Sequence, residues 1–206
     1  MNSIHQIRKA EIHVHLEATI TPDLCRKFAN KNKVDLPSDI FGNKYAYEWS
    51  DFYDFIKKYD LVTSVIHTPE DYFELTYKYL KECALAGVMY VEAMVSSTHA
   101  KLKGMTYHSF LEGVEEASKK AETDYGIVSR YIMNGIRHLG PESVQQTAKE
   151  VLDNPLPILW VLDSLVMSCI FLLHFSNQLL ICFMQKIIPL LCMLGSGMDL
   201  KIFVKL

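Results

Sequence analysis

The sequence predicts an α/β fold in which strands and helices alternate. Apolar segments with strand character occur at 10–16, 88–96 and 126–136, and helical periodicity follows each of them. This alternation is typical of βα units and a parallel sheet. Because no G-x-G-x-x-G turn of a dinucleotide-binding sheet follows the first strand, we expect the N-terminal part of a (β/α)8 TIM-type barrel, truncated after about three to four βα units.

Capping residues predict where the helices begin. Thr21 and Pro22 start a helix after the first strand, and Thr68 and Pro69 start a longer one. Between them, residues 49–59 carry aromatic side chains at helical spacing. Two later segments are also expected to be helical: 109–124 and 140–154.

Composition limits the classes of function. The chain has 206 residues, half of them hydrophobic, which is enough for one sizeable core. Its 21 basic and 24 acidic residues form no block of like charge, so we expect no nucleic-acid partner. No apolar secretory segment is visible near the N-terminus, and we therefore expect a cytoplasmic protein.

The composition changes near residue 157. Only five charged residues follow it: Asp163, Lys186, Asp199, Lys201 and Lys205. We therefore divide the chain into residues 1–156, part of a barrel, and 157–206, an apolar tail expected not to be natively folded. A membrane anchor is the alternative for the tail, but a spanning helix needs roughly 20 apolar residues in a row, and polar residues interrupt this stretch.

Two histidines stand one residue apart in the first predicted strand, "KAEIHVHLEATITPDL". Side chains i and i+2 of a strand share a face, and at the carboxyl end of a barrel strand this face lines the active-site mouth. His13 and His15 could therefore hold one divalent metal, although a catalytic zinc needs a third protein ligand and an open position for water. A purely structural histidine pair is the alternative, because H-x-H alone is a weak motif.

The same stretch resembles the first strand and loop of the adenosine deaminase family of metal-dependent hydrolases, usually H-x-H-L-(D/E)-G followed by Ser or Thr. The resemblance continues through "DFYDFIKKYD", "TPEDYFELTYKYLKECALAGVMYVEAMVSSTHA" and "NGIRHLGPES" and covers roughly residues 8–155. It implies zinc-dependent hydrolytic deamination of adenosine to inosine and ammonia in purine metabolism, with a small-molecule purine nucleoside or base as the only expected partner. The oligomeric state stays open.

The resemblance also implies roles for particular residues. His13 and His15 would be the first two ligands of one Zn²⁺ ion per site, and Glu17 would lie near the sugar or the outer rim of the purine pocket. Four residues of the following helix would form an apolar lid over the substrate: Phe52, Phe55, Ile56 and Tyr59. The alternative for these four is ordinary packing of an amphipathic helix.

The downstream motifs of the family are absent from the protein sequence. The family has G-F-G-L-A-G-D-E on its fourth strand, then H-A-G-E, a further histidine and an Asp-Asp pair. These supply the third zinc histidine, the proton-transferring glutamate, the histidine that polarises the water and the metal-binding aspartate. Because none is retained in frame, we expect this chain to be an inactive, truncated remnant.

Codon degeneracy suggests how the motifs were lost. If translation is shifted to the third base of each codon, permitted codons for "WVLDSLVMSC" can encode G-F-G-L-A-G-D-E, and those for "CMLGSGMDLK" can encode H-A-G-E-W-D-G-P-E. Both motifs lie in the same shifted frame and in the family's order. We therefore expect a frameshift between about Asn154 and Trp160.

Other functions remain open. An adenine deaminase of the same superfamily is the first alternative, because Glu17 and Thr19 also suit a pocket without ribose. A non-catalytic half-barrel is the second, because an unclosed sheet leaves exposed strand edges. A membrane-tethered fragment is the third, with the apolar tail as anchor.

Overall fold

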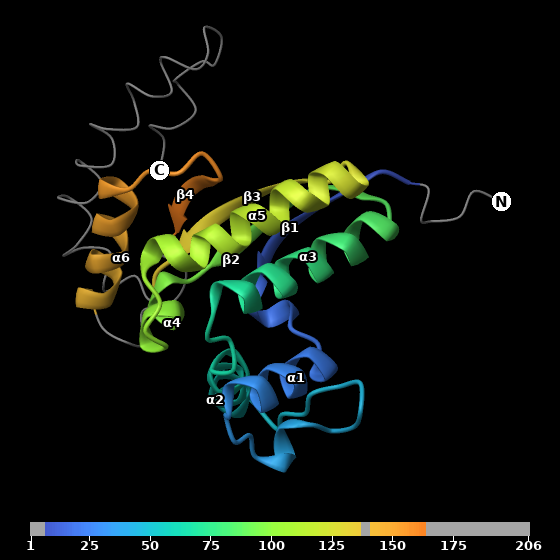
Figure 1. Cartoon of the computed structure of the whole chain (residues 1–206). Coiled ribbons are helices and arrows are strands. Elements are labelled where there is room, and N and C mark those ends of the chain that lie inside the picture. The colour runs from blue at the N-terminus through green and yellow to red at the C-terminus, as the bar shows by residue number, and fades with distance from the viewer. Residues whose placement is uncertain (1–6, 137–140, 164–206) are drawn as a thin grey trace, which may run out of the picture. The chain divides into compact units, whose positions relative to one another are not determined.

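A computed structural model of the chain describes residues 7–136 and 141–163. The chain divides into two compact units, Met1–Leu165 and Val166–Leu206, and all described residues belong to the first. This unit contains one parallel sheet of four strands in the order β1-β2-β3-β4 (Figure 1). The strands are β1 Lys9–His15, β2 Val88–Val95, β3 Val128–Asn134 and β4 Leu159–Asp163.

Each strand pairs in parallel with the next strand along the chain, and helices connect them. The helical elements are η2 Leu16–Thr19, α1 Pro22–Asn32, η3 Ser38–Ile40, α2 Phe52–Thr63, α3 Pro69–Leu85, α4 Ser97–Leu102, α5 Tyr107–Tyr125 and α6 Pro141–Asp153. Sequential parallel pairing with helical crossovers is how a (β/α)8 barrel begins. The predicted fold class is therefore confirmed.

Local capping sets the helix starts as predicted. The Thr21 hydroxyl accepts a hydrogen bond from the Leu24 amide, and Pro22 is the first residue of α1. Thr68 and Asp71 form a reciprocal capping box at the start of α3. The short helix α4 was not predicted, because six residues are too few to show a helical period.

One face of the sheet is packed against helices. Along β2 and β3, alternate residues are fully buried in the core that includes α3 and α5: Val91, Ala93, Val95, Tyr131 and Met133. These two helices pack side by side over this face (Figure 1). Because side chains alternate along a strand, the intervening residues point the other way, toward what is the interior in a closed barrel. We call this the interior face.

A buried carboxylate joins α1 to α3. Asp71 is fully buried, and its oxygens accept hydrogen bonds from Lys31 Nζ at 2.7 Å and Asn32 Nδ2 at 2.8 Å. The backbone amides of His67 and Thr68 donate to Asp71 Oδ2 at 3.0 and 3.1 Å. Burial alone would raise the pKa of Asp71, but Lys31 and these donors hold it below its ordinary value.

Replacing Asp71 with asparagine should lower the free energy of unfolding at neutral pH by about 2 kcal/mol, because an amide cannot accept all four bonds. The folded-state pKa of Asp71 lies below its unfolded value, so its contribution is present above the unfolded pKa and is lost as the pH falls through the folded pKa. Urea unfolding between pH 7 and pH 2 should therefore show the two proteins converging in acid.

Asp23→Asn is the matched control, because Asp23 makes an exposed ion pair with Arg26 and its loss should change stability by less than about 0.5 kcal/mol. A difference between Asp71→Asn and the unchanged protein that is the same at every pH would contradict the assignment of the effect to the Asp71 charge.

The structure reaches into the segment that begins at residue 157. Leu159–Asp163, which the sequence placed in the unfolded tail, form β4 and pair with β3, because their apolar composition suits a strand of a parallel sheet. The rest of that segment, 164–206, lies outside the described residues. No helix in the described part of the chain is long and apolar enough to cross a membrane.

Candidate functional site

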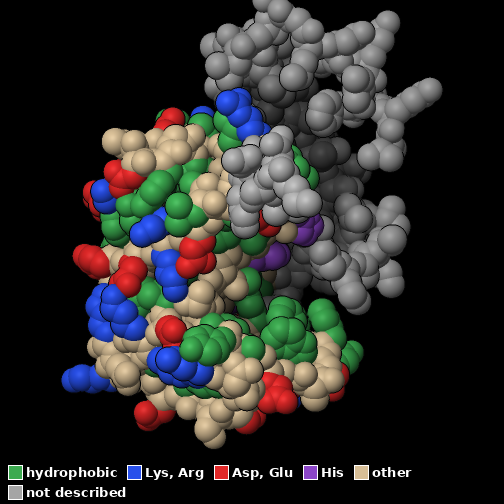
Figure 2. Space-filling model, turned by 90° about the vertical axis from the view of Figure 1, so that its right-hand side faces the viewer, with side chains coloured by type: hydrophobic (Ala, Val, Ile, Leu, Met, Phe, Trp, Pro, Cys, Tyr) green, Lys and Arg blue, Asp and Glu red, His purple; other side chains and the backbone are tan. Residues whose placement is uncertain are grey.

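The candidate site lies at the carboxyl ends of β1, β2 and β3, where barrel enzymes place their catalytic loops. His13 and His15 come from the end of β1, Glu17 from the η2 turn that follows, and Ser96 from the residue after β2. Histidine side chains gather on the face of the molecule shown in Figure 2, with hydrophobic side chains next to them.

His13 occupies a bulge in β1. The pairing of β1 with β2 passes from Ile12↔Glu92 directly to Val14↔Ala93, and His13 has φ 61°. This is a left-handed conformation that costs a non-glycine residue roughly 1–3 kcal/mol and is concentrated at functional sites. The bulge was not predicted, because nothing in the spacing of H-x-H distinguishes it from a regular strand.

The bulge still leaves the two imidazoles near each other. Their ring centroids are 6.4 Å apart with planes at 76°; His13 is exposed and His15 is half-buried. Two histidines supply part of a zinc site, and a catalytic zinc needs three protein ligands. Within residues 7–136 and 141–163, no group of three or more His, Cys, Asp or Glu side chains could hold a metal. The ligand role of the pair stays a prediction.

Glu17 is buried beneath this edge of the sheet, and its predicted place near the substrate stays a prediction. Its side chain is 1% exposed, and Oε1 accepts hydrogen bonds from the Ser96 amide at 3.0 Å and the Tyr72 hydroxyl at 3.4 Å. The η2 turn directs the carboxylate inward, where these donors compensate part of its desolvation. Burial raises the pKa of Glu17 to about 7 and the hydrogen bonds oppose this rise, so the group exchanges a proton near neutral pH.

The predicted lid residues form a row of rings along α2. Phe52 and Phe55 stack with centroids 6.3 Å apart, and Phe55 and Tyr59 follow at 6.2 Å. Phe52 is 65% exposed, whereas Phe55, Ile56 and Tyr59 are half-buried. An exposed apolar surface next to a site is unusual for a helix that only packs into a core. The lid role of this row stays a prediction.

The row leads to the end of β2. Tyr59 contacts the ring of His99 in α4, centroid to centroid 5.8 Å. Burial raises the pKa of Tyr59, and the charges of Glu17 and Asp60 raise it further, which places these acids near its hydroxyl. Sequence reasoning assigned no role to Ser96 or His99. The signal that could have found them is the polar run "SSTH" directly after an apolar strand.

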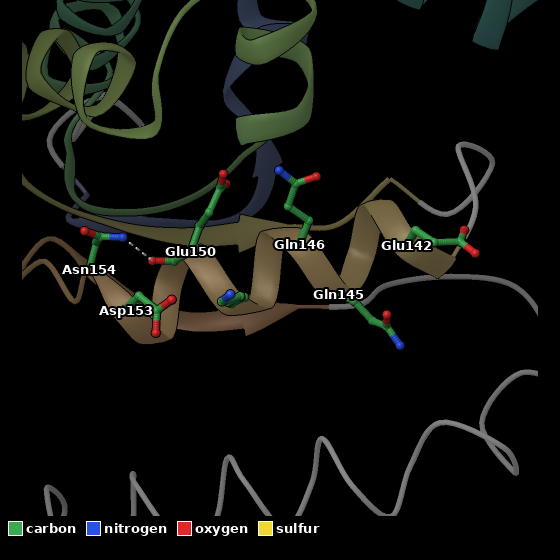
Figure 3. A pocket seen from close by; sticks show the side chains of 7 residues that line it. Glu142, Gln145, Gln146, Glu150, Asp153 and Asn154 are labelled. Atoms are coloured by element: carbon green, nitrogen blue, oxygen red, sulfur yellow. Dashed lines mark hydrogen bonds between the residues drawn. The ribbon is translucent and has the colours of Figure 1, made fainter.

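A separate hollow lies along α6. It encloses about 510 Å³ and is lined by Glu142, Gln145, Gln146, Lys149, Glu150, Asp153 and Asn154. Figure 3 shows these side chains spread along a single helix and pointing in different directions rather than toward one centre. Because a binding site needs a few converging polar groups among apolar walls, we assign no function to this surface.

Comparison with known proteins identifies relatives for most of the chain. The adenosine deaminase family matches residues 8–154. Adenine deaminase from Sinorhizobium fredii is 43% identical over 143 residues, 69% of this chain and 44% of the relative. Adenine deaminase from Sinorhizobium medicae is 40% identical over 152 residues, 74% of this chain and 46% of the relative. The chain thus spans less than half the length of these relatives.

Solved structures agree with the fold. The adenine deaminase of Arthrobacter aurescens superposes with a TM-score of 0.66 at 26% identity, covering 76% of this chain and 49% of that one. An amidohydrolase of Burkholderia ambifaria, solved with bound zinc, superposes with a TM-score of 0.67 at 17% identity, covering 79% of this chain and 45% of that one; at this identity it shows the fold alone. The matched residues and the identities together show that the chain belongs to the adenosine deaminase family.

Proposed function

We propose that the chain is the N-terminal part of an adenine deaminase, which hydrolyses the C6 amine of adenine to give hypoxanthine and ammonia. Sequence reasoning placed adenosine first and adenine second. The order is reversed here because the relatives with about 40% identity are adenine deaminases.

His13 and His15 are the proposed zinc ligands of this chain. Zinc, when bound, generates the hydrolytic nucleophile near neutral pH. Their rings lie 6.4 Å apart at the carboxyl end of β1, and zinc is present in the amidohydrolase from B. ambifaria. The aromatic row on α2 is proposed to cover the planar base and exclude water.

The reading frame is proposed to change between about Asn154 and Trp160. The family match ends at residue 154, the charged residues become sparse after 157, and the shifted frame can encode both missing motifs. It follows that the chain as translated has two metal ligands and no general acid, and we expect it not to deaminate. We therefore propose that this chain is a non-catalytic fragment and that the frame-restored protein is the deaminase.

The test is to sequence the gene across codons 150–206, restore the family frame, and measure ammonia release from adenine and adenosine. We expect the restored protein to prefer adenine in kcat/KM by about a hundredfold or more, and the original chain to release no ammonia. Stop codons in the shifted frame would refute the frameshift. A restored enzyme that prefers adenosine would refute the substrate assignment.

A further inference from the structure

Several buried polar atoms have no hydrogen-bond partner within the described residues. Ser96 Oγ and Asn134 Oδ1, both at the carboxyl edge of the sheet, are among them and are shielded from solvent. Ser96 is 4% exposed. An unsatisfied buried polar group costs free energy and persists where a water or ligand completes it.

The local helix does not use the Ser96 hydroxyl. Ser96 is the N-cap of α4, a position at which serine usually accepts a bond from the first turn, but its side chain makes no capping bond. Thr106 at the start of α5 and Thr68 at the start of α3 do make theirs. The Ser96 side chain therefore points elsewhere.

Ser96 and Asn134 lie next to each other on the interior face. Val95 is paired with Met133, so the residues one position later, Ser96 and Asn134, are neighbours on adjacent strands. Their side chains point away from the core-facing Val95 and Met133, because successive side chains alternate. On the other side of β2, His15 is paired with Met94, two positions before Ser96, so Ser96 lies at the carboxyl end of the strand next to His15.

We propose that Ser96 and Asn134 form a subsite that binds the edge of a purine base on which a ring-nitrogen acceptor is adjacent to a ring N–H donor. The Ser96 hydroxyl donates to N3 of adenine, and Asn134 Oδ1 accepts from N9–H. This deepens the proposed function and rests on it. Adenosine carries ribose at N9 and cannot donate there, so Asn134 favours the free base over the nucleoside.

The chain contains a matched control next to Ser96. Ser97 is 0% exposed, and its hydroxyl also lacks a hydrogen-bond partner among the described residues. Ser97 is the first residue of α4 and follows the extended Ser96 (φ −123°, ψ 110°), so the strand register that places Ser96 beside Asn134 ends before Ser97. Ser96→Ala and Ser97→Ala therefore remove the same hydroxyl group from two adjacent buried positions, of which the proposed subsite uses only the first.

The experiment measures binding of adenine and 9-methyladenine to the full chain by NMR titration, with thermal melting to check folding. We expect Ser96→Ala to weaken both ligands about tenfold, the effect of one lost hydrogen bond, and Ser97→Ala to change neither. The unchanged chain should bind adenine about tenfold more tightly than 9-methyladenine. Asn134→Ala should abolish this preference by weakening adenine alone.

Three results would overturn the subsite: no adenine binding by the unchanged chain, equal losses in Ser96→Ala and Ser97→Ala, or a preference for adenine that survives in Asn134→Ala. None of these bears on ammonia release by the frame-restored enzyme. The subsite and the proposed function can therefore fail separately.

Discussion

Replacing His13 or His15 with alanine in the frame-restored protein should leave it without bound zinc and reduce adenine deamination by at least about a thousandfold. Each ring supplies one of the few bonds that hold the ion, and the nucleophile depends on that ion. The bulge gives the structural reason for expecting this: His13 has φ 61° near the carboxyl end of β1, a conformation that is costly for a non-glycine residue and is concentrated at functional sites. Zinc content by elemental analysis and ammonia release measure the two effects.

His108→Ala is the matched control, because His108 is an exposed histidine in the first turn of α5 and is not one of the proposed zinc ligands. Zinc content and activity should stay unchanged in this variant. Full zinc occupancy in both His13→Ala and His15→Ala would show that the pair is structural.

Gly113→Ala should lower the free energy of unfolding strongly, although it adds only one methyl group to a helix. Gly113 lies in α5 where it crosses the start of α3, and a Cβ built there would meet the carbonyl oxygen of Pro69 at 2.1 Å. At an open helix position this substitution stabilises by about 1 kcal/mol. Here α3 and α5 must separate, and we expect the free energy of unfolding to fall by about 3 kcal/mol.

Gly126→Ala separates this steric effect from backbone strain. Gly126 ends α5 with φ 70°, and a Cβ there would meet no atom within 4 Å, so only the cost of a left-handed residue applies, about 1 kcal/mol. Urea unfolding should give Gly113→Ala a clearly lower free energy of unfolding than Gly126→Ala. A Gly113→Ala protein as stable as the original would mean that α3 and α5 do not pack this closely in solution.

Much of the fold could be predicted from the sequence because it depends on local chemistry. Thr21 with Pro22 and Thr68 with Pro69 start their helices through bonds within one turn, and alternating βα units imply a parallel sheet. The strand predicted at 126–136 was too long at both ends, because Gly126 belongs to the cap of α5 and the strand ends at Asn134. Capping competes with strand pairing at such boundaries, and the sequence does not show which prevails.

By itself, the sequence determined the family, the alternating architecture and the identity of the histidine pair, since these are properties of residues close together in the chain. Only the tertiary structure decided that His13 lies in a bulge, that Glu17 is buried against the Ser96 amide, and that the Ser96 side chain makes no capping bond to α4. These features depend on the pairing of β1 with β2, residues almost eighty positions apart. Burial and hydrogen-bond partners depend on contacts between residues far apart in the chain, so they cannot be predicted from the spacing of neighbouring residues.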